Sequence, residues 1–87
     1  MALNFPNRSR SYDATRRAVR FWGYDGPMEA AFFVSEDALK GIAPGVGGDE
    51  AGLLGVFDSH RDLIHAIAMK IYMRARKGSY ELSAADF

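Results

Sequence analysis

The chain has 87 residues, of which 48% are hydrophobic and 13% aromatic, a composition typical of one small folded domain. It contains no cysteine, which excludes disulfide bonds, thiolate metal sites and cysteine nucleophiles. Eleven basic and eleven acidic residues give a formal net charge of zero, so the long-range attraction of a dedicated nucleic-acid binder is missing, although local basic patches remain.

Residues 1–16 are expected to form an N-terminal arm of a single domain that covers residues 1–87. Loop-forming residues such as Pro6 and Asp13 dominate this stretch, and Leu3 with Phe5 can form a short edge strand that holds it. The start has no apolar core of a signal peptide, and no segment approaches membrane-spanning length. We therefore expect a cytoplasmic protein.

Two alternating segments, residues 17–24 and 28–34, lie on either side of Asp25-Gly26 and predict a β-hairpin with a two-residue turn. Pro27 leaves a four-residue loop as an alternative, and a one-residue slip would exchange the two faces of a strand. With the two-residue turn, one face carries Val19, Phe21, Met28, Ala30, Phe32 and Val34. The other face carries Arg20, Trp22, Tyr24, Glu29, Ala31 and Phe33.

Two helices are predicted after the hairpin. Ser35 followed by two acids begins a short helix that ends before Pro44. After a glycine-rich loop, residues 49–76 have a helical apolar stripe, made of Leu53, Phe57, His60, Ile64, Ile67, Ala68, Ile71 and Ala75. We favour one long helix; a break near Asp58 is the alternative, because Ser59 and Asp62 can form a capping box.

The last segment is predicted to be a strand. Gly78 ends the long helix, residues 79–82 form the third strand, and residues 83–86 open a final helical turn. The predicted fold is α+β with the order β-β-α-α-β. A small antiparallel sheet, made of the hairpin and the C-terminal strand, packs on one long amphipathic helix.

No arrangement of residues predicts catalysis, cofactor binding or a metal site. Residues 45–48 lack the strand and the Gly-Lys-Ser/Thr of a nucleotide loop, and the acids that follow would repel phosphate. His60 and His65 lie about 140° apart on a helix and cannot hold one metal together, and His60 is expected in the core. An enzyme is disfavoured, since 87 residues leave little room for a substrate pocket.

Two apolar surfaces exceed what one small sheet and one helix can bury. The long helix is apolar on a second side, and the outer face of the hairpin combines aromatic residues with arginine, which is typical of protein interfaces. We therefore expect a small non-enzymatic interaction module, a homodimer or one bound to a protein partner. The candidate contact residues are Leu63, Met69, Met73, Trp22, Tyr24 and Phe33.

Regulatory nucleic-acid binding is the alternative function. Arginines near aromatic side chains on an open sheet can bind single strands, because bases stack on the rings and phosphates meet the guanidinium groups. Glu29 on the same face weakens this interpretation. The candidate contacts are Arg8, Arg10, Arg16, Arg17 and Arg20, with Trp22.

The whole chain resembles the bacterial family known as domain of unknown function 1488. The resemblance rests on Val19-Arg20-Phe21, on Asp25-Gly26, on the segment Phe57-Asp58-Ser59-His60-Arg61 continuing to Tyr72, and on residues 78–87. These residues are turns and core positions. The resemblance therefore implies a compact bacterial α+β domain and carries no catalytic or binding residue over to this chain.

Overall fold

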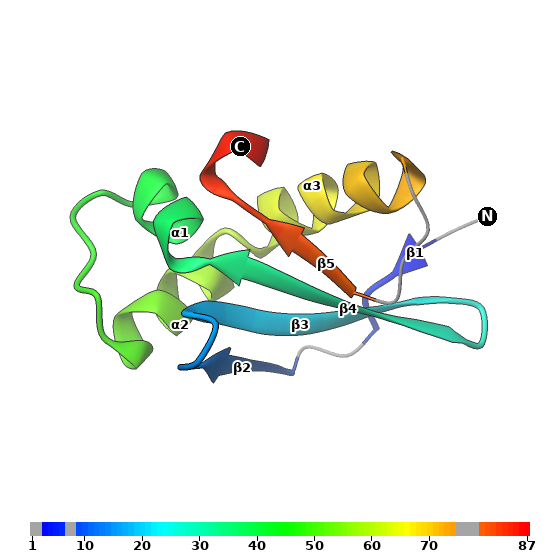
Figure 1. Cartoon of the computed structure of the whole chain (residues 1–87), viewed down its shortest axis with the longest axis horizontal. Coiled ribbons are helices and arrows are strands. Elements are labelled where there is room, and N and C mark those ends of the chain that lie inside the picture. The colour runs from blue at the N-terminus through cyan, green and yellow to red at the C-terminus, as the bar shows by residue number, and fades with distance from the viewer. Residues whose placement is uncertain (1–2, 7–8, 75–78) are drawn as a thin grey trace.

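The computed structural model describes residues 3–6, 9–74 and 79–87. The α+β fold class is confirmed (Figure 1). The chain forms strands β1 (Leu3–Asn4), β2 (Arg10–Asp13), β3 (Ala18–Asp25) and β4 (Met28–Ser35), helices α1 (Glu36–Ile42), α2 (Glu50–Ser59) and α3 (Arg61–Arg74), strand β5 (Ser79–Leu82) and the 3-10 turn η1 (Ala84–Asp86). The predicted helix stop at Gly78 lies outside the described residues.

The five strands form one mixed sheet. β3 is antiparallel to β4, and both β1 and β2 pair with the other edge of β3, so the predicted arm contributes two strands to the sheet. β5 is parallel to β4, which corrects the prediction of an antiparallel C-terminal strand. The three helices carry the chain back to the end of the sheet where β4 begins, and such a crossover is what a parallel pair requires.

The hairpin turn lies one residue later than predicted. Asp25 pairs with Met28, so the two loop residues are Gly26 and Pro27. Gly26 has a φ of +60°, while proline fixes a negative φ at the second position, a combination that suits a type II′ turn. The cross-strand pairing thereby shifts by two residues. Because side chains alternate with a period of two, both predicted faces are preserved.

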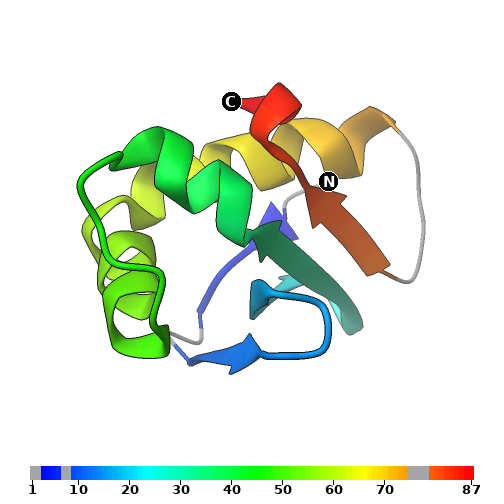
Figure 2. The ribbon, with the colours of Figure 1, turned by 60° about the vertical axis from the view of Figure 1, so that its left-hand side comes forward.

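The helix predicted over residues 49–76 is two helices that meet at His60. A straight helix of that length would span roughly 40 Å, more than the 37 Å long axis of the molecule. Figure 2 shows α2 and α3 running in different directions. His60, predicted in the core, is instead half-buried at this junction, where its Nδ1 lies 3.1 Å from the carbonyl oxygen of Val56.

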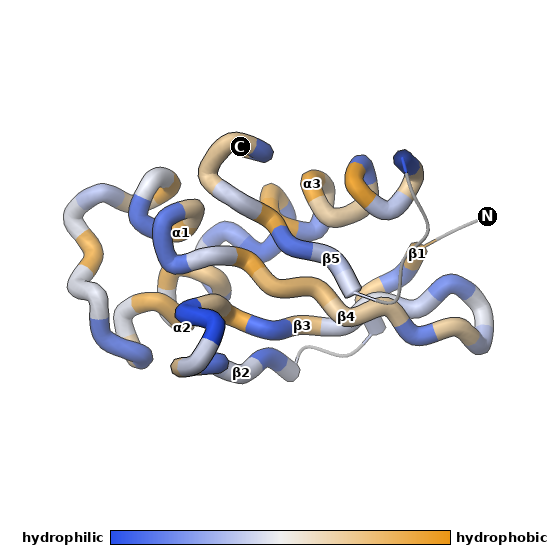
Figure 3. The backbone as a smooth tube through the Cα atoms, in the orientation of Figure 1, coloured by the Kyte–Doolittle hydropathy of each residue, from blue (hydrophilic) through white to orange (hydrophobic). Residues whose placement is uncertain are grey.

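All three helices contribute to one core on the inner face of the sheet. The residues fully buried there include Val19, Phe21, Phe32, Val34, Leu53, Phe57 and Ile64. Figure 3 shows hydrophobic colouring along most of β4, one of the two inner strands of the sheet. On the opposite face of β3, Arg20, Trp22 and Tyr24 remain partly exposed. Figures 1 and 2 show the helices gathered on the other side of the sheet. In the described part of the chain, no helix has the length and apolarity needed to cross a membrane.

Candidate interaction surfaces

The first candidate surface is the side of α3 that points away from the core, here called the helix face. It consists of Asp62, Leu63, Ala66, Met69, Lys70, Met73 and Arg74, all of them exposed. The opposite side of α3 is anchored in the core by Ile64, Ala68 and Tyr72. Tyr72 also donates a hydrogen bond from its hydroxyl to Asp25 Oδ2 at 2.9 Å, which ties α3 to the hairpin.

The helix face exposes large apolar side chains. Leu63 is 45% exposed, Met69 43% and Met73 66%. With Ala66 they are spaced three, three and four residues apart, so all four lie on the outward side of α3. These three predicted contact residues therefore lie together at the surface.

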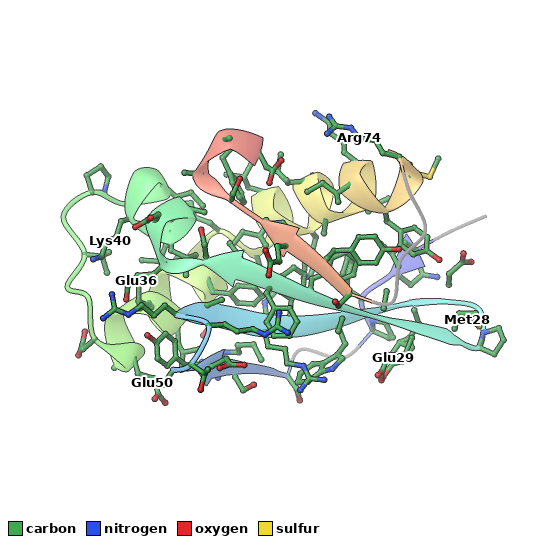
Figure 4. The ribbon with its side chains drawn as sticks, in the orientation of Figure 1. Met28, Glu29, Glu36, Lys40, Glu50 and Arg74 are labelled. Atoms are coloured by element: carbon green, nitrogen blue, oxygen red, sulfur yellow. The ribbon has the colours of Figure 1, made fainter. Side chains whose placement is uncertain are left out.

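The charges of the helix face are divided between its two ends. Asp62 lies in the first turn of α3, whereas Lys70 and Arg74 lie toward its carboxyl end. Figure 4 shows Arg74 projecting from the end of the helix, away from the sheet. None of these three side chains forms an ion pair with another residue in the described ranges.

The second candidate surface is the outer face of the sheet, here called the sheet face. Its centre is a stack of arginine and aromatic side chains. The guanidinium of Arg16 lies 4.2 Å from the ring centre of Phe33. That of Arg20 lies 4.9 Å from Trp22 and 5.8 Å from Phe33. These distances are typical of cation–π contacts.

The stack hides one of the predicted contact residues. Phe33 is on the predicted face of β4 but is only 8% exposed, so its expected exposure is wrong. The reason is that Arg16, from the turn before β3, lies across the ring. Trp22 and Tyr24 remain half-buried. The arginine side chains therefore cover part of the aromatic surface of the sheet face.

Acidic side chains neutralise part of the sheet face. Glu81 of β5 pairs in register with Phe33 and places its Oε2 3.4 Å from Arg16 Nη1. At the hairpin end, the hydroxyl of Tyr24 donates to Glu29 Oε2 at 3.0 Å, and this hydrogen bond raises the pKa of Tyr24. Glu81 was not among the predicted residues. It reaches this face because β5 pairs in parallel with β4, and the pairing of two strands so far apart in the sequence leaves no local sequence pattern.

Four of the five arginines predicted for nucleic-acid binding lie in the described residues, and these four do not gather in one place. Arg8 lies outside the described residues. Arg10 points to the opposite side of the sheet, toward α2, where it binds Asp58. Arg17 is exposed in the turn with a φ of +52°. Of the four described arginines, only Arg16 and Arg20 join the aromatic stack.

An ion cluster at the end of α2 was missed by sequence reasoning. Asp58 accepts hydrogen bonds from Arg10 Nε at 2.9 Å and Nη2 at 2.7 Å, and from Arg61 Nη2 at 2.7 Å. The hydrogen bonds and positive charge of Arg10, followed by those of Arg61, lower the pKa of Asp58 against the opposing effect of burial. Arg61 is 9% exposed and also lies 4.8 Å from the ring centre of Phe57. This cluster fastens α2, α3 and β2 together.

The cavity beside the stack of Arg16 on Phe33 is small. It measures about 110 Å³ and is lined by Arg16, Ala18, Phe33, Ser35, Glu81, Leu82 and Ser83. Small-molecule sites in proteins are usually clefts of about 300–1,000 Å³. Within residues 3–6, 9–74 and 79–87, no three His, Asp or Glu side chains come together as a metal-ligand set.

Comparison with known proteins identifies a family. The model of the family described as "Protein of unknown function (DUF1488)" matches residues 3–83. A crystal structure of a protein of unknown function from the same family, from Shewanella loihica PV-4, is similar with a TM-score of 0.81 and 17% sequence identity. The similarity covers 92% of this chain and 90% of that one, so the two share a fold. A search of curated proteins gave no match.

Proposed function

The chain belongs to the DUF1488 family, and we propose that it is a non-enzymatic protein-interaction module that works as a homodimer in the bacterial cytoplasm. The exposed apolar side of α3 carries this proposal. Five large hydrophobic side chains are exposed among the described residues, and three of them, Leu63, Met69 and Met73, lie on the helix face. Clustered exposed apolar residues mark interaction sites more often than scattered ones do.

The chemistry of the exposed residues supports contact with a protein. Methionine is flexible and polarisable, and it adapts its shape to a partner surface. Isolated surface leucines and methionines are common in monomers, but here they follow one another along a single helix. The groups with a shifted pKa belong to two polar pairs. Asp58 with Arg10 joins a helix to a strand, and Tyr24 with Glu29 joins two strands. Pairs that connect elements in this way suit a structural role.

Nucleic-acid binding is the second candidate, and the stack of Arg20 on Trp22 favours it. Single-strand binding uses such stacks on open sheets. Against it, Glu81 neutralises Arg16, and Glu29 adds negative charge at the other end of the same face. A surface with both signs of charge suits a protein partner better than a phosphate backbone.

Light scattering of the purified chain from low to high micromolar concentration tests the proposed homodimer. The expected result is a mass that rises from the monomer value of 9.6 kDa toward twice that value. A mass that stays at 9.6 kDa throughout would contradict it.

A further inference from the structure

We propose that two copies of this chain bind each other through their helix faces, with the two α3 helices antiparallel and the sheet faces left free. The inference rests on the proposed homodimer and assigns its interface and geometry. It follows from the spacing, size and charge of the residues on the outward side of α3.

The spacing of the outward residues is symmetric. Asp62, Ala66, Met69 and Met73 follow one another at intervals of four, three and four, and all of them are exposed. Reading the helix backward gives the same intervals. An antiparallel copy therefore presents a matching row, in which Asp62 lies opposite Met73 of the second copy and Ala66 lies opposite Met69.

Side-chain size also matches in this arrangement. Ala66 is small and Met69 is long, so the methionine of each copy fills the space that the alanine of the other leaves. Large residues opposite small ones allow two helices to approach at the usual 8–10 Å or so. Leu63, 45% exposed beside this row, extends the apolar contact along one flank.

The separated charges favour the antiparallel direction. Two parallel helices would place Asp62 next to Asp62, and Arg74 next to Arg74. The antiparallel pair brings Asp62 of one copy to the end that carries Lys70 and Arg74 of the other. Within the described part of the chain these three groups have no ion-pair partner in the same molecule. Opposed helix dipoles add a small favourable term.

The size of the contact sets the strength of the dimer. A single pair of four-turn helices buries less than the roughly 800 Å² per partner of a standard stable interface. We therefore expect a dimer that dissociates on dilution. The sheet face lies on the other side of the molecule from α3 and stays accessible in this arrangement.

Disulfide trapping tests the geometry. Because the chain has no native cysteine, every disulfide that forms must involve an introduced cysteine. Two single variants, Asp62→Cys and Met73→Cys, are oxidised separately and as an equimolar mixture. Their positions lie about 16 Å apart along one helix, whereas a disulfide needs Cα atoms within about 7 Å. If the helices are antiparallel, the mixture should give a disulfide-linked dimer, and this dimer should consist of one chain of each variant. Each variant alone should give little product.

Ala31→Cys, opposite Trp22 on the sheet face, is the matched control and should not cross-link to itself. Circular dichroism establishes that all three variants are folded, and light scattering of the unmodified chain is run alongside. Two outcomes would overturn the antiparallel α3 interface but not the homodimer. In one, the unmodified chain has a dimeric mass but the mixture forms no mixed disulfide; in the other, Asp62→Cys cross-links to itself. Efficient linkage through Ala31→Cys would also overturn it and assign the interface to the sheet face. A constant monomer mass overturns the homodimer itself.

Discussion

Arg10 of β2 forms a two-point ion pair with Asp58 at the end of α2, with both donor–acceptor distances below 3.0 Å. The two residues are 48 positions apart in the chain. Asp58 simultaneously accepts from Arg61, the first residue of α3. One carboxylate thus holds the edge of the sheet to the junction where the two main helices change direction.

Replacing this carboxylate should destabilise the fold in a pH-dependent manner. Asp58→Asn removes the charged acceptor of both arginines and leaves the buried Arg61 guanidinium poorly compensated, so we expect a loss of about 1–2 kcal/mol at neutral pH. The pKa of Asp58 is lowered in the folded protein. Its contribution is therefore present above the unfolded value, about 3.9, and disappears as the pH falls through the lower folded value. Urea unfolding at pH 7 and in strong acid measures the difference.

The matched control for this variant is Asp37→Asn on α1, an exposed acid without an ion pair to any described residue. It should change stability by about 0.5 kcal/mol or less. A stability gap between the wild type and Asp58→Asn that is equally large in strong acid would show that the charge is not its source.

Two glycine-to-alanine substitutions should have opposite signs. A Cβ at Gly23 would lie 2.8 Å from Phe5 Cε1 and 3.1 Å from Leu3 Cδ1, and Phe5 is itself stacked on His65 at 3.9 Å. Gly23→Ala should therefore cost about 1–3 kcal/mol. A Cβ at Gly55, inside α2, meets nothing within 4 Å, so Gly55→Ala should stabilise by roughly 0.5–1 kcal/mol. Thermal unfolding of both variants checks the pair, and a stabilised Gly23→Ala would refute the packing of the N-terminal strand.

The single tryptophan reports on the sheet face. Trp22 lies beside Arg20 on that face, so bound bases would quench its fluorescence. We expect no change on titration with short single- or double-stranded oligonucleotides at low salt, because Glu81 neutralises Arg16 and Glu29 adds negative charge to the same face. Quenching that weakens as salt is added would instead support the nucleic-acid alternative. Arg20→Gln serves as the control for a specific contact.

Local patterns predicted the elements and faces well. The alternation around Asp25-Gly26 placed Val19 and Phe32 inside and Trp22 outside, even though the turn lies one residue later. Ser35 caps α1 as expected, with its hydroxyl oxygen accepting from the backbone of Ala38 at 3.1 Å. Such features depend on periodicity and on neighbouring residues, which are visible in one sequence.

Long-range relationships could not be predicted in the same way. The parallel pairing of β5 brings Glu81 to Phe33, and the ion pair brings Asp58 to Arg10, but neither pair has a local signal. Burial of Phe33 depends on how the Arg16 side chain folds back over the sheet. The break at His60 is a different case, because the apolar periodicity fits one helix or two and leaves the break as the alternative. The length of a straight helix, greater than that of the molecule, favours two helices.

Sedimentation equilibrium of Met73→Glu beside Met28→Glu tests most directly whether α3 carries the docking surface. Both methionines are 66% exposed in the monomer, one on the helix face and the other at the tip of the hairpin. A buried charge at the contact is costly, so Met73→Glu should remain at 9.6 kDa. The wild type and Met28→Glu should both approach twice that mass. If all three proteins remain monomeric, or if Met73→Glu associates as well as the wild type, α3 is not the surface through which this protein binds its own copy.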